Sequence, residues 1–266
     1  MLTIVPLGGL CNRLRAVLSA LSLSQQLHAE VQVKWAENEE CHARFDALFV
    51  PIDSGRFHIG PMTWWARPSR KRNLHLPRII RACMGYTWQR DGFAPTSLDE
   101  LAEALKHHRK VYVSSGSQLA HYSSECLSRL CPRADLQARI DRMLQSYAPH
   151  TVGVHIRRTD NAVSIQHSPV EAFIHAMRQE MDQDRHVKFF LATDDAAVKR
   201  ELEQLFPYRI ITQHVPTSRD TLQGMEDALV DLWCLAGTQK LLGSYWSSFT
   251  DTAAEIGRVP LVIVRA

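Results

Sequence analysis

The chain has 266 residues, of which 45% are hydrophobic and 22% are charged. This composition is that of a globular protein, and the length fits one large domain or two modest ones. The net charge of +3 does not indicate a general nucleic-acid binder. No run approaches the 18 consecutive apolar residues of a transmembrane helix, and the first residues lack the basic region of a signal peptide. We therefore expect a cytoplasmic protein.

The cysteines indicate neither a disulfide framework nor a metal site. No two of them form a Cys-x-x-Cys pair, and no histidine at metal spacing completes a zinc site. We expect free buried thiols at all six positions: Cys11, Cys41, Cys83, Cys126, Cys131 and Cys234.

The N-terminal half begins with the pattern of a nucleotide-binding α/β fold. Residues 2–7 predict a buried strand, Gly8-Gly9 a turn, residues 14–27 a helix and residues 31–35 a second strand. Further along, the pattern predicts a helix over 98–107, a strand over 111–114 and a helix over 134–147.

The segment from Ser54 to Arg90 loses this regular pattern and is strongly basic. It contains eight Lys and Arg residues and no Asp or Glu, with Trp and Tyr residues between them. Two interpretations stay open. The segment is a docking surface for an anionic or lipid-linked acceptor, with peripheral contact at the inner membrane face, or it is a solvated loop whose tryptophans pack on the domain.

Strands and helices alternate regularly in the C-terminal half. The predicted strands are 151–156, 187–192, 208–212, 240–243 and 260–264, and the helices are 169–182, 196–205, 220–237 and 249–257. This alternation predicts a parallel sheet with helices on both faces. Pro149 separates the two patterns, so we expect an N-terminal, acceptor-side lobe over 1–148 and a C-terminal, donor-binding lobe over 149–266.

The most specific motif is His155-Ile156-Arg157-Arg158-Thr159-Asp160, which follows a predicted strand. Ligands of open α/β sheets bind at the carboxyl ends of strands. Two adjacent guanidinium groups there fit a diphosphate, whose oxygens they bind in pairs. A structural Arg–Asp ion pair is the alternative explanation.

Two further motifs follow later strands. Ala192-Thr193-Asp194-Asp195 predicts a buried strand followed by a capped helix, and its carboxylates could hold the arginines in position. Ser247-Ser248-Phe249-Thr250 places hydroxyl groups at a helix N-terminus, which is typical of an anion site. Each motif alone is also explained by ordinary helix capping.

The glycine turn near the N-terminus is the fourth motif. Gly8 and Gly9 allow a ligand to approach the backbone, and Asn12 follows in the first helical turn. The sequence contains neither Gly-x-Gly-x-x-Gly nor Gly-x-x-x-x-Gly-Lys-Ser/Thr, so neither a nicotinamide nor a P-loop enzyme is indicated.

Together the four motifs resemble the fucosyltransferase superfamily. The first is similar to the His-x-Arg-Arg-x-Asp motif of α1,6-fucosyltransferases, including the core-fucosylating and nodulation-factor enzymes. The second is similar to their second motif, and the third resembles the form found in protein O-fucosyltransferases. The resemblance implies a GT-B-like architecture of two Rossmann-like lobes. It also implies an inverting, metal-independent transfer of fucose from GDP-fucose to a glycan, with no cofactor, and a place in polysaccharide biosynthesis.

The resemblance also implies roles for individual residues. Arg157 and Asp160 would be catalytic, with Arg157 at the β-phosphate. Asp194 and Asp195 would hold the arginines in position without contacting the donor. The donor-binding set would comprise Gly8, Gly9, Asn12, His155, Arg158, Asp231, Ser247, Ser248 and Thr250, with Asp231 pairing with the guanine edge.

The sequence departs from the family pattern at two places. Cys11 stands where the superfamily has Gly, and the stretch after Asp160 lacks the Glu that acts as base in the core-fucosylating enzymes. An inverting reaction needs a base for the acceptor hydroxyl, and Asp160, His167 and Glu171 are the candidates. Three other hypotheses stay open: another donor sugar, a GDP-binding protein without catalysis, and a nucleic-acid-binding protein that uses residues 54–90.

Overall fold

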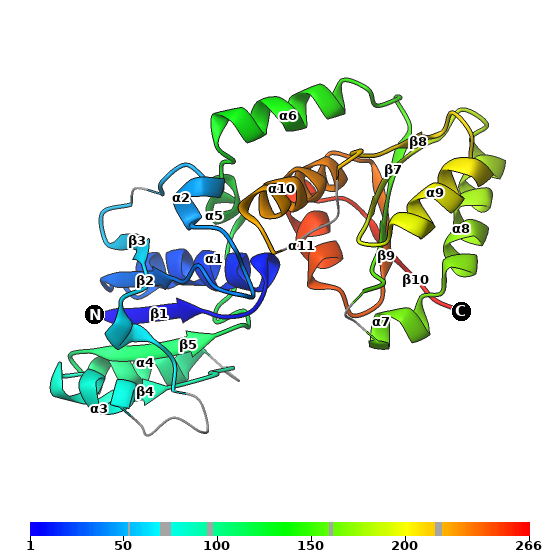
Figure 1. Ribbon diagram of the computed structural model, residues 1–266. Helices are drawn as coiled ribbons and strands as arrows, with labels where there is room; N and C mark the ends of the chain where they lie inside the picture. Colours follow the sequence, from blue (N-terminus) through cyan, green and yellow to red (C-terminus); the bar gives the residue numbers. More distant parts are fainter. Residues whose placement is uncertain (53, 70–75, 95–97, 160–161, 216–219) are drawn as a thin grey trace. The chain divides into compact units, whose positions relative to one another are not determined.

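The structure, a computed structural model, describes residues 1–52, 54–69, 76–94, 98–159, 162–215 and 220–266. The chain divides into two compact units, Met1–Arg133 and Ala134–Ala266 (Figure 1). Each unit contains a five-stranded sheet, and every strand pairing in both sheets is parallel. Two parallel sheets with helical connections confirm the predicted GT-B-like α/β class.

The sheet of the first unit has the strand order β3-β2-β1-β5-β4. Its strands are β1 (Leu2–Pro6), β2 (Val31–Trp35), β3 (Phe57–Pro61), β4 (Trp88–Arg90) and β5 (Val111–Ser115). The helical elements are α1 (Leu10–Gln26), α2 (Phe45–Leu48), η1 (Trp64–Ala66), α3 (Leu76–Cys83), α4 (Leu98–His107) and α5 (Ser124–Ser128). The strand, glycine turn and helix predicted at the start of the chain are confirmed as β1, residues 8–9 and α1.

The basic segment is more regular than its sequence predicts. It supplies both edge strands of the sheet, β3 and β4, and the short helices η1 and α3 between them. Trp65 stacks on the buried Tyr86, with ring centroids 5.6 Å apart. The interpretation as a solvated loop is therefore wrong for the described part of the segment. Trp65 packs on the unit as that interpretation expected, but Trp64 is 65% exposed. The irregular pattern arises because edge strands are short and only partly buried.

The sheet of the second unit has the order β10-β9-β6-β7-β8. Its strands are β6 (Thr151–Ile156), β7 (Lys188–Thr193), β8 (Ile210–Ile211), β9 (Lys240–Ser244) and β10 (Leu261–Val264). The helices are α6 (Ala134–Leu144), α7 (Ala162–His167), α8 (Val170–Gln183), α9 (Ala196–Leu205), α10 (Leu222–Ala236) and α11 (Ser248–Gly257). Since the first strand in sequence, β6, lies at the centre, this is Rossmann-like winding with a reversal of direction between β6 and β9.

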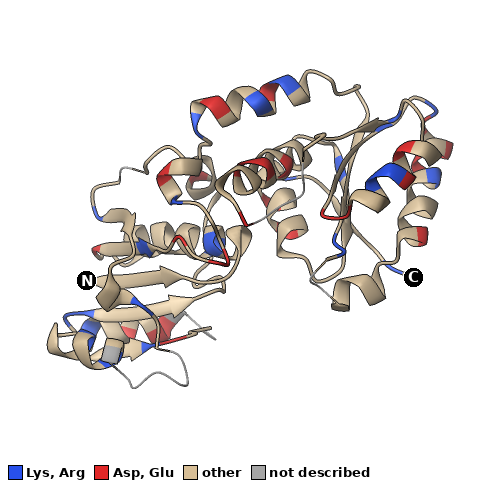
Figure 2. Ribbon diagram, in the orientation of Figure 1, with Lys and Arg blue, Asp and Glu red and all other residues tan. Residues whose placement is uncertain are grey.

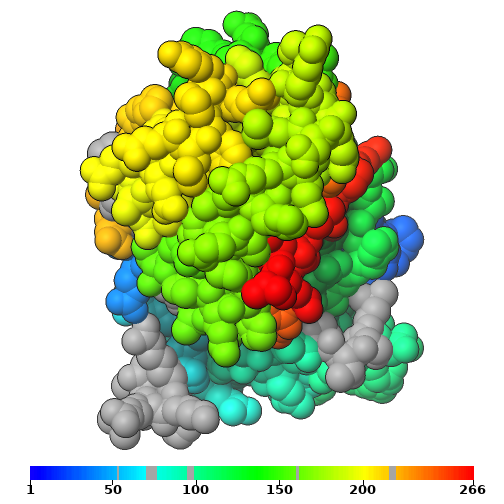
Figure 3. Space-filling view, turned by 90° about the vertical axis from the view of Figure 1, so that its right-hand side faces the viewer, coloured from blue at the N-terminus to red at the C-terminus, as the bar shows by residue number. Residues whose placement is uncertain are grey.

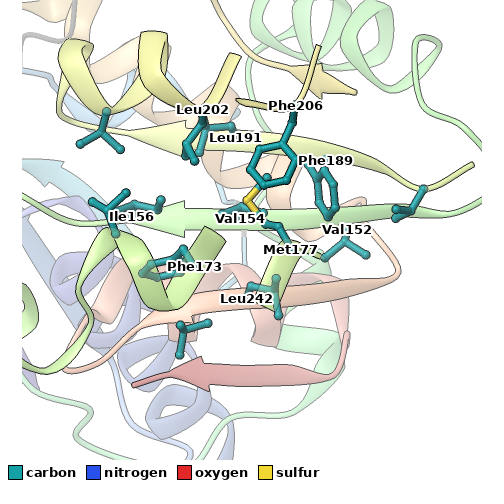
Figure 4. Packing of buried hydrophobic residues seen from close by; sticks show 14 residues of the cluster. Val152, Val154, Ile156, Phe173, Met177, Phe189, Leu191, Leu202, Phe206 and Leu242 are labelled. Carbon is teal, nitrogen blue, oxygen red and sulfur yellow. The ribbon is translucent and has the colours of Figure 1, made fainter. Parts of the chain in front are cut away.

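Helices cover both faces of this second sheet (Figure 1). On one face, α8 and α9 pack on alternate residues of β6 and β7, and the largest core side chains there are Phe173, Phe189 and Phe206 (Figure 4). The space-filling view shows α9 (yellow) beside α8 (yellow-green), with the edge strand β10 in red (Figure 3). Burying each such side chain contributes about 2–3 kcal/mol. The other face packs against α10 and α11.

The boundary between the units lies one helix earlier than the residue 148–149 boundary that we expected. Helix α6 belongs to the second unit, because it packs on α10. The proline at position 149 follows α6 rather than separating the units. Within the described residues, no helix is both long enough and apolar enough to cross a membrane.

Candidate active site

The carboxyl ends of β6 and β9 meet where the winding of the second sheet reverses. His155 pairs with Gly243 in the register of these two strands, so the residues after each strand emerge side by side. This reversal is where open parallel sheets bind ligands, because the connections leave in opposite directions and open a crevice. The first and third sequence motifs therefore lie at one edge of one sheet.

Asp194 organises the turn that follows β6. Its carboxylate accepts hydrogen bonds from the backbone nitrogens of Arg158 (2.7 Å) and Thr159 (3.4 Å) and from the Thr159 hydroxyl (2.8 Å). It also pairs with Arg157, with Nη1 3.2 Å from Oδ2. Arg158 in turn donates to the carbonyl of Ser168 at 3.2 Å. The two arginines are thus directed differently, and Arg157 is the one that Asp194 holds by its guanidinium.

Ser244 links the ends of β6 and β9. Its hydroxyl accepts a hydrogen bond from the backbone nitrogen of Arg157 at 3.0 Å and donates to the carbonyl of His155 at 3.2 Å. Ser244 is fully buried. Because both bonds go to the main chain, Ser244 fixes the backbone position from which the Arg157 side chain starts.

His155 is a buried, neutral side chain. Its Nδ1 lies 2.6 Å from the Thr250 hydroxyl, and its ring stacks on Phe249 with centroids 4.8 Å apart. Burial, together with the charge of Arg157, lowers the pKa of His155 to about 3. Its contribution at neutral pH is therefore shape and hydrogen bonding rather than charge.

A glycine allows helix α11 to approach β9 closely. A Cβ atom on Gly243 would lie 2.0 Å from Cγ2 of Thr250. Because this position has no side chain, α11 reaches β9 and brings Thr250 to His155. A close approach of helix to strand thus explains the pairing of residues from the first and third motifs.

The N-terminus of α11 keeps its hydrogen-bonding groups available. Ser247 is the N-cap residue, yet its side chain makes no capping hydrogen bond, although such a bond is the usual role of an N-cap serine. Ser248 follows as the first helical residue. Trp246, just before the cap, is 71% exposed and has a φ of +56°, a conformation that is rare for an aromatic residue. The free backbone N–H groups of a helix start attract anions.

Asp231 lies on α10 within a second polar cluster. Gln213, just beyond β8, donates from Nε2 to Asp231 Oδ1 at 2.7 Å and to the backbone carbonyl of Asp227 at 2.9 Å. Arg139 on α6 donates to Gln213 Oε1 at 3.0 Å and pairs with Asp227. Acidic residues line this helix (red in Figure 2). Burial raises the pKa of Asp231 to about 6, against the opposing effect of the Gln213 hydrogen bond.

The N-terminal motif lies in the first unit, directly after β1. Gly8 has a φ of +80°, and a Cβ there would lie 2.9 Å from Asn12 Nδ2, so this turn requires glycine. The Gly8 nitrogen donates to Glu40 Oε2 at 3.0 Å, and Gly9 is the N-cap of α1. Cys11 is buried in α1. These residues thus lie together in the turn at the carboxyl end of β1.

The remaining predicted residues have simpler positions. Asp195 caps α9 by accepting from the nitrogens of Ala197 and Val198, so its carboxylate serves that helix. Asp160 lies outside the described residues. Of the other base candidates, His167 is exposed and stacks edge-on against Tyr245, and Glu171 is exposed in the first turn of α8.

The cysteines are free, and Cys83 and Cys131 are exposed rather than buried as expected. In the part of the chain that the structure describes, no group of three or more His, Cys, Asp or Glu side chains is placed to hold a metal ion.

Sequence reasoning missed Ser244, Gln213 and Trp246. Ser244 and Gln213 act on other site residues through hydrogen bonds between distant parts of the chain. The available signal was their position, Ser244 at the end of β9 and Gln213 just after β8. The left-handed backbone of Trp246 has no signature in the sequence.

Comparison with solved structures shows that the chain has the fold of several fucosyltransferases. No protein-family model and no curated protein matches the sequence. Among solved structures, the fucosyltransferase NodZ from Bradyrhizobium is 21% identical, with a TM-score of 0.66 over 98% of this chain and 94% of that one. A mutant of Arabidopsis thaliana FUT1 in complex with GDP is 12% identical, with a TM-score of 0.65 over 98% of this chain and 69% of that one. POFUT1 in complex with GDP is 11% identical, with a TM-score of 0.56 over 99% and 98%.

These likenesses confirm the GT-B-like fold that the four motifs indicated. NodZ has also been solved in a crystal soaked with GDP-fucose. The chain therefore has the GT-B-like fold shared by NodZ, plant FUT1 and POFUT1.

Proposed function

We propose that this protein is a glycosyltransferase that moves fucose from GDP-fucose to a glycan acceptor, with inversion and without a metal ion. The observation that carries the proposal is the guanidinium of Arg157. This guanidinium lies at the carboxyl end of β6 and pairs with Asp194 at 3.2 Å. The hydrogen bond to Ser244 fixes the backbone of Arg157. The fold is that of proteins crystallised with GDP or GDP-fucose.

The proposed reaction is a single displacement. The acceptor hydroxyl attacks the anomeric carbon of fucose while the bond from that carbon to the diphosphate oxygen breaks, so that the glycoside and GDP are the products. Negative charge develops on the leaving oxygen, and a guanidinium placed there in advance stabilises it. Arg157 takes this role, and the N-terminus of α11 with Ser247 and Ser248 binds phosphate oxygens.

The proton of the acceptor hydroxyl leaves to a carboxylate or imidazole. Asp160, His167 and Glu171 are the candidates. His155 does not serve as the base, because its Nδ1 engages Thr250 and its pKa lies near 3. Its uncharged ring instead lies beside the two arginines.

Asp231 supplies nucleotide selectivity in this proposal. Guanine presents two N–H donors on one edge, which a carboxylate can accept, whereas adenine and uracil do not present this pair. Gly8, Gly9 and Asn12 of the first unit are proposed to contact the donor. Following the resemblance to nodulation-factor enzymes, we place the reaction in cytoplasmic polysaccharide biosynthesis, on a glycan or lipid-linked glycan.

The test combines binding with turnover. Calorimetric titration with GDP, UDP and ADP should show clear preference for GDP, and GDP-fucose should then be consumed with undiminished rate in EDTA. Arg157→Ala should lower kcat by about 10²–10³-fold, as loss of a transition-state donor does, while Arg178→Ala on the exposed surface of α8 should leave it unchanged. Equal affinity for the three nucleotides, or an Arg157→Ala variant with normal turnover, contradicts the proposal.

A further inference from the structure

The first unit contains a large cavity at the carboxyl end of its own sheet. Its volume is about 1280 Å³, and it is lined by residues at the ends of β1 and β5 and by residues that follow β1, β2, β3 and β4. Small-molecule pockets commonly enclose about 300–1,000 Å³. This cavity therefore has room for a ligand of several sugar units.

One wall of the cavity is the loop after β2, which a buried arginine holds in place. Arg13 of α1 is fully buried and donates to the carbonyls of Gly8 (2.6 Å) and Ala36 and to Asn38 Oδ1 (2.7 Å). Burying a guanidinium is costly unless it is fully hydrogen-bonded. This loop is thus a fixed surface, although its side chains face solvent.

A second buried arginine holds the opposite wall. Arg81 of α3 is fully buried, donates to the carbonyl of Arg67 at 2.9 Å, and pairs with Asp91 at 3.0 Å. Its guanidinium also lies 3.7 Å from the ring centre of Tyr112. Two buried charges that each fasten a wall of the same cavity indicate a preformed binding site.

Trp64 is presented on this second wall. It is 65% exposed, whereas its neighbours in η1 are fastened: Trp65 stacks on Tyr86, and the carbonyl of Ala66 accepts a hydrogen bond from Tyr112 at 2.8 Å. An exposed indole on a fixed helix offers a flat apolar face. The C–H face of a sugar ring packs on such a surface, while the hydroxyls at its rim remain free to form hydrogen bonds.

Carboxylates dominate the polar lining of the first wall. Glu37, Glu39 and Glu40 are exposed residues of the loop after β2, and all three line the cavity. Arg67 is the only Lys or Arg among the described lining residues. Glu40 also lies 3.9 Å from the buried Arg13, and Asp91 is paired with Arg81. Carboxylates accept hydrogen bonds from hydroxyl and ammonium groups and repel anions. This lining disfavours the anionic acceptor that the basic composition of residues 54–90 indicated.

We infer that this cavity binds the acceptor as a non-anionic oligosaccharide, with a sugar ring packed on Trp64 and its hydroxyl or ammonium groups held by the glutamates. The inference rests on the proposed function, since it names the acceptor class for that reaction. It adds a site, carried by Trp64 and Glu37, that none of the four motifs contains.

The test measures glycan binding to the whole chain without any donor. Three tetrasaccharides serve as probes in calorimetric titrations: a neutral one built of glucose, one built of glucosamine and one built of galacturonate. The glucosamine and glucose probes should bind, and the galacturonate probe should bind at least tenfold more weakly. Trp64→Ala should weaken binding about tenfold and Glu37→Gln about threefold. Ile79→Ala and Glu30→Gln, which change exposed residues outside the lining, should change it by less than twofold.

The outcomes separate this inference from the proposed function. Binding of galacturonate as tightly as glucosamine, or unchanged binding in Trp64→Ala, overturns the acceptor site. Nucleotide titrations on the same preparation report on the donor site independently. GDP binding without binding of any glycan probe refutes the acceptor inference alone, and glycan binding without GDP binding refutes the donor assignment alone.

Discussion

The side-chain amide of Gln213 donates a hydrogen bond to Asp231 Oδ1 at 2.7 Å, joining the segment after β8 to helix α10. This bond fixes the orientation of the Asp231 carboxylate. Its pKa of about 6, raised by burial, places its ionisation close to neutral pH.

Asp231→Asn should stabilise the protein at pH 8. The native carboxyl has a pKa raised from 3.8 to about 6 by burial, so the unfolded chain ionises it more readily than the folded one. Its contribution to stability is present in full below about pH 4 and is lost as the pH rises through 6. Asparagine still accepts from Gln213 and carries no charge. Urea unfolding should show a gain of about 2–3 kcal/mol at pH 8 that disappears near pH 4.

The same variant should lose affinity for GDP, because an amide cannot accept both guanine N–H groups as a carboxylate can. Asp182→Asn on the exposed surface of α8 is the matched control and should change neither quantity. A stabilised variant that binds GDP normally would show that Asp231 is a structural residue only.

Gln213→Met should shift the pH dependence of GDP binding upward. The hydrogen bond from Gln213 lowers the pKa of Asp231, so its removal raises that pKa further above 6. Affinity for GDP should then be weakened at pH 7 and recover toward pH 8. Gln223→Met removes an amide that bonds to Asp227 instead, and its pH profile should match that of the native protein. Identical profiles for both variants would remove Gln213 from nucleotide recognition.

Much of the fold was predictable because the second sheet is buried on both faces. Its strands are continuous apolar runs, and capped helices separate them, as at Asp195 before α9 and Thr221 before α10. The structure of the first unit was harder to predict from the sequence. The edge strands β3 and β4 are short, and Arg81, whose charge indicated an exposed residue, is fully buried through contacts with residues distant in sequence.

The strand-end positions of the candidate site were also predictable, because parallel strands bring their carboxyl ends to one edge. The role of each side chain at this edge of the sheet could not be predicted. Adjacent carboxylates have separate tasks, since Asp194 orders the turn after β6 and Asp195 caps a helix. The cavity beside Trp64 is formed by the ends of β1 and β5 and by the segments that follow β1, β2, β3 and β4, and no local sequence pattern indicates such a convergence.

Asp194→Asn should lower kcat for GDP-fucose turnover by about tenfold to a hundredfold. The amide can still accept from the backbone of Arg158 with its oxygen, but it no longer pairs by charge with Arg157. Arg157 then loses its orientation, so the effect should fall on kcat more than on KM. Asp195→Asn is the matched control: asparagine also caps helices well, so both kinetic constants should stay near native values. A rise in KM with unchanged kcat would indicate that Asp194 only shapes the nucleotide site.

Gly257→Ala should destabilise the packing of α11 on α10. A Cβ at this position would lie 2.0 Å from the backbone carbonyl oxygen of Ala236, and a main-chain atom at the end of a packed helix cannot move aside as a side chain can. Overpacking of this kind costs about 3 kcal/mol, measurable by urea unfolding. Because α11 carries Ser247 and Thr250, GDP affinity should fall as well. Gly60→Ala, whose Cβ would meet no atom within 4 Å, should change stability by less than about 0.5 kcal/mol. If Gly257→Ala unfolds like the native protein but loses GDP binding, the helix contact is adjustable and α11 acts on the nucleotide through its position alone.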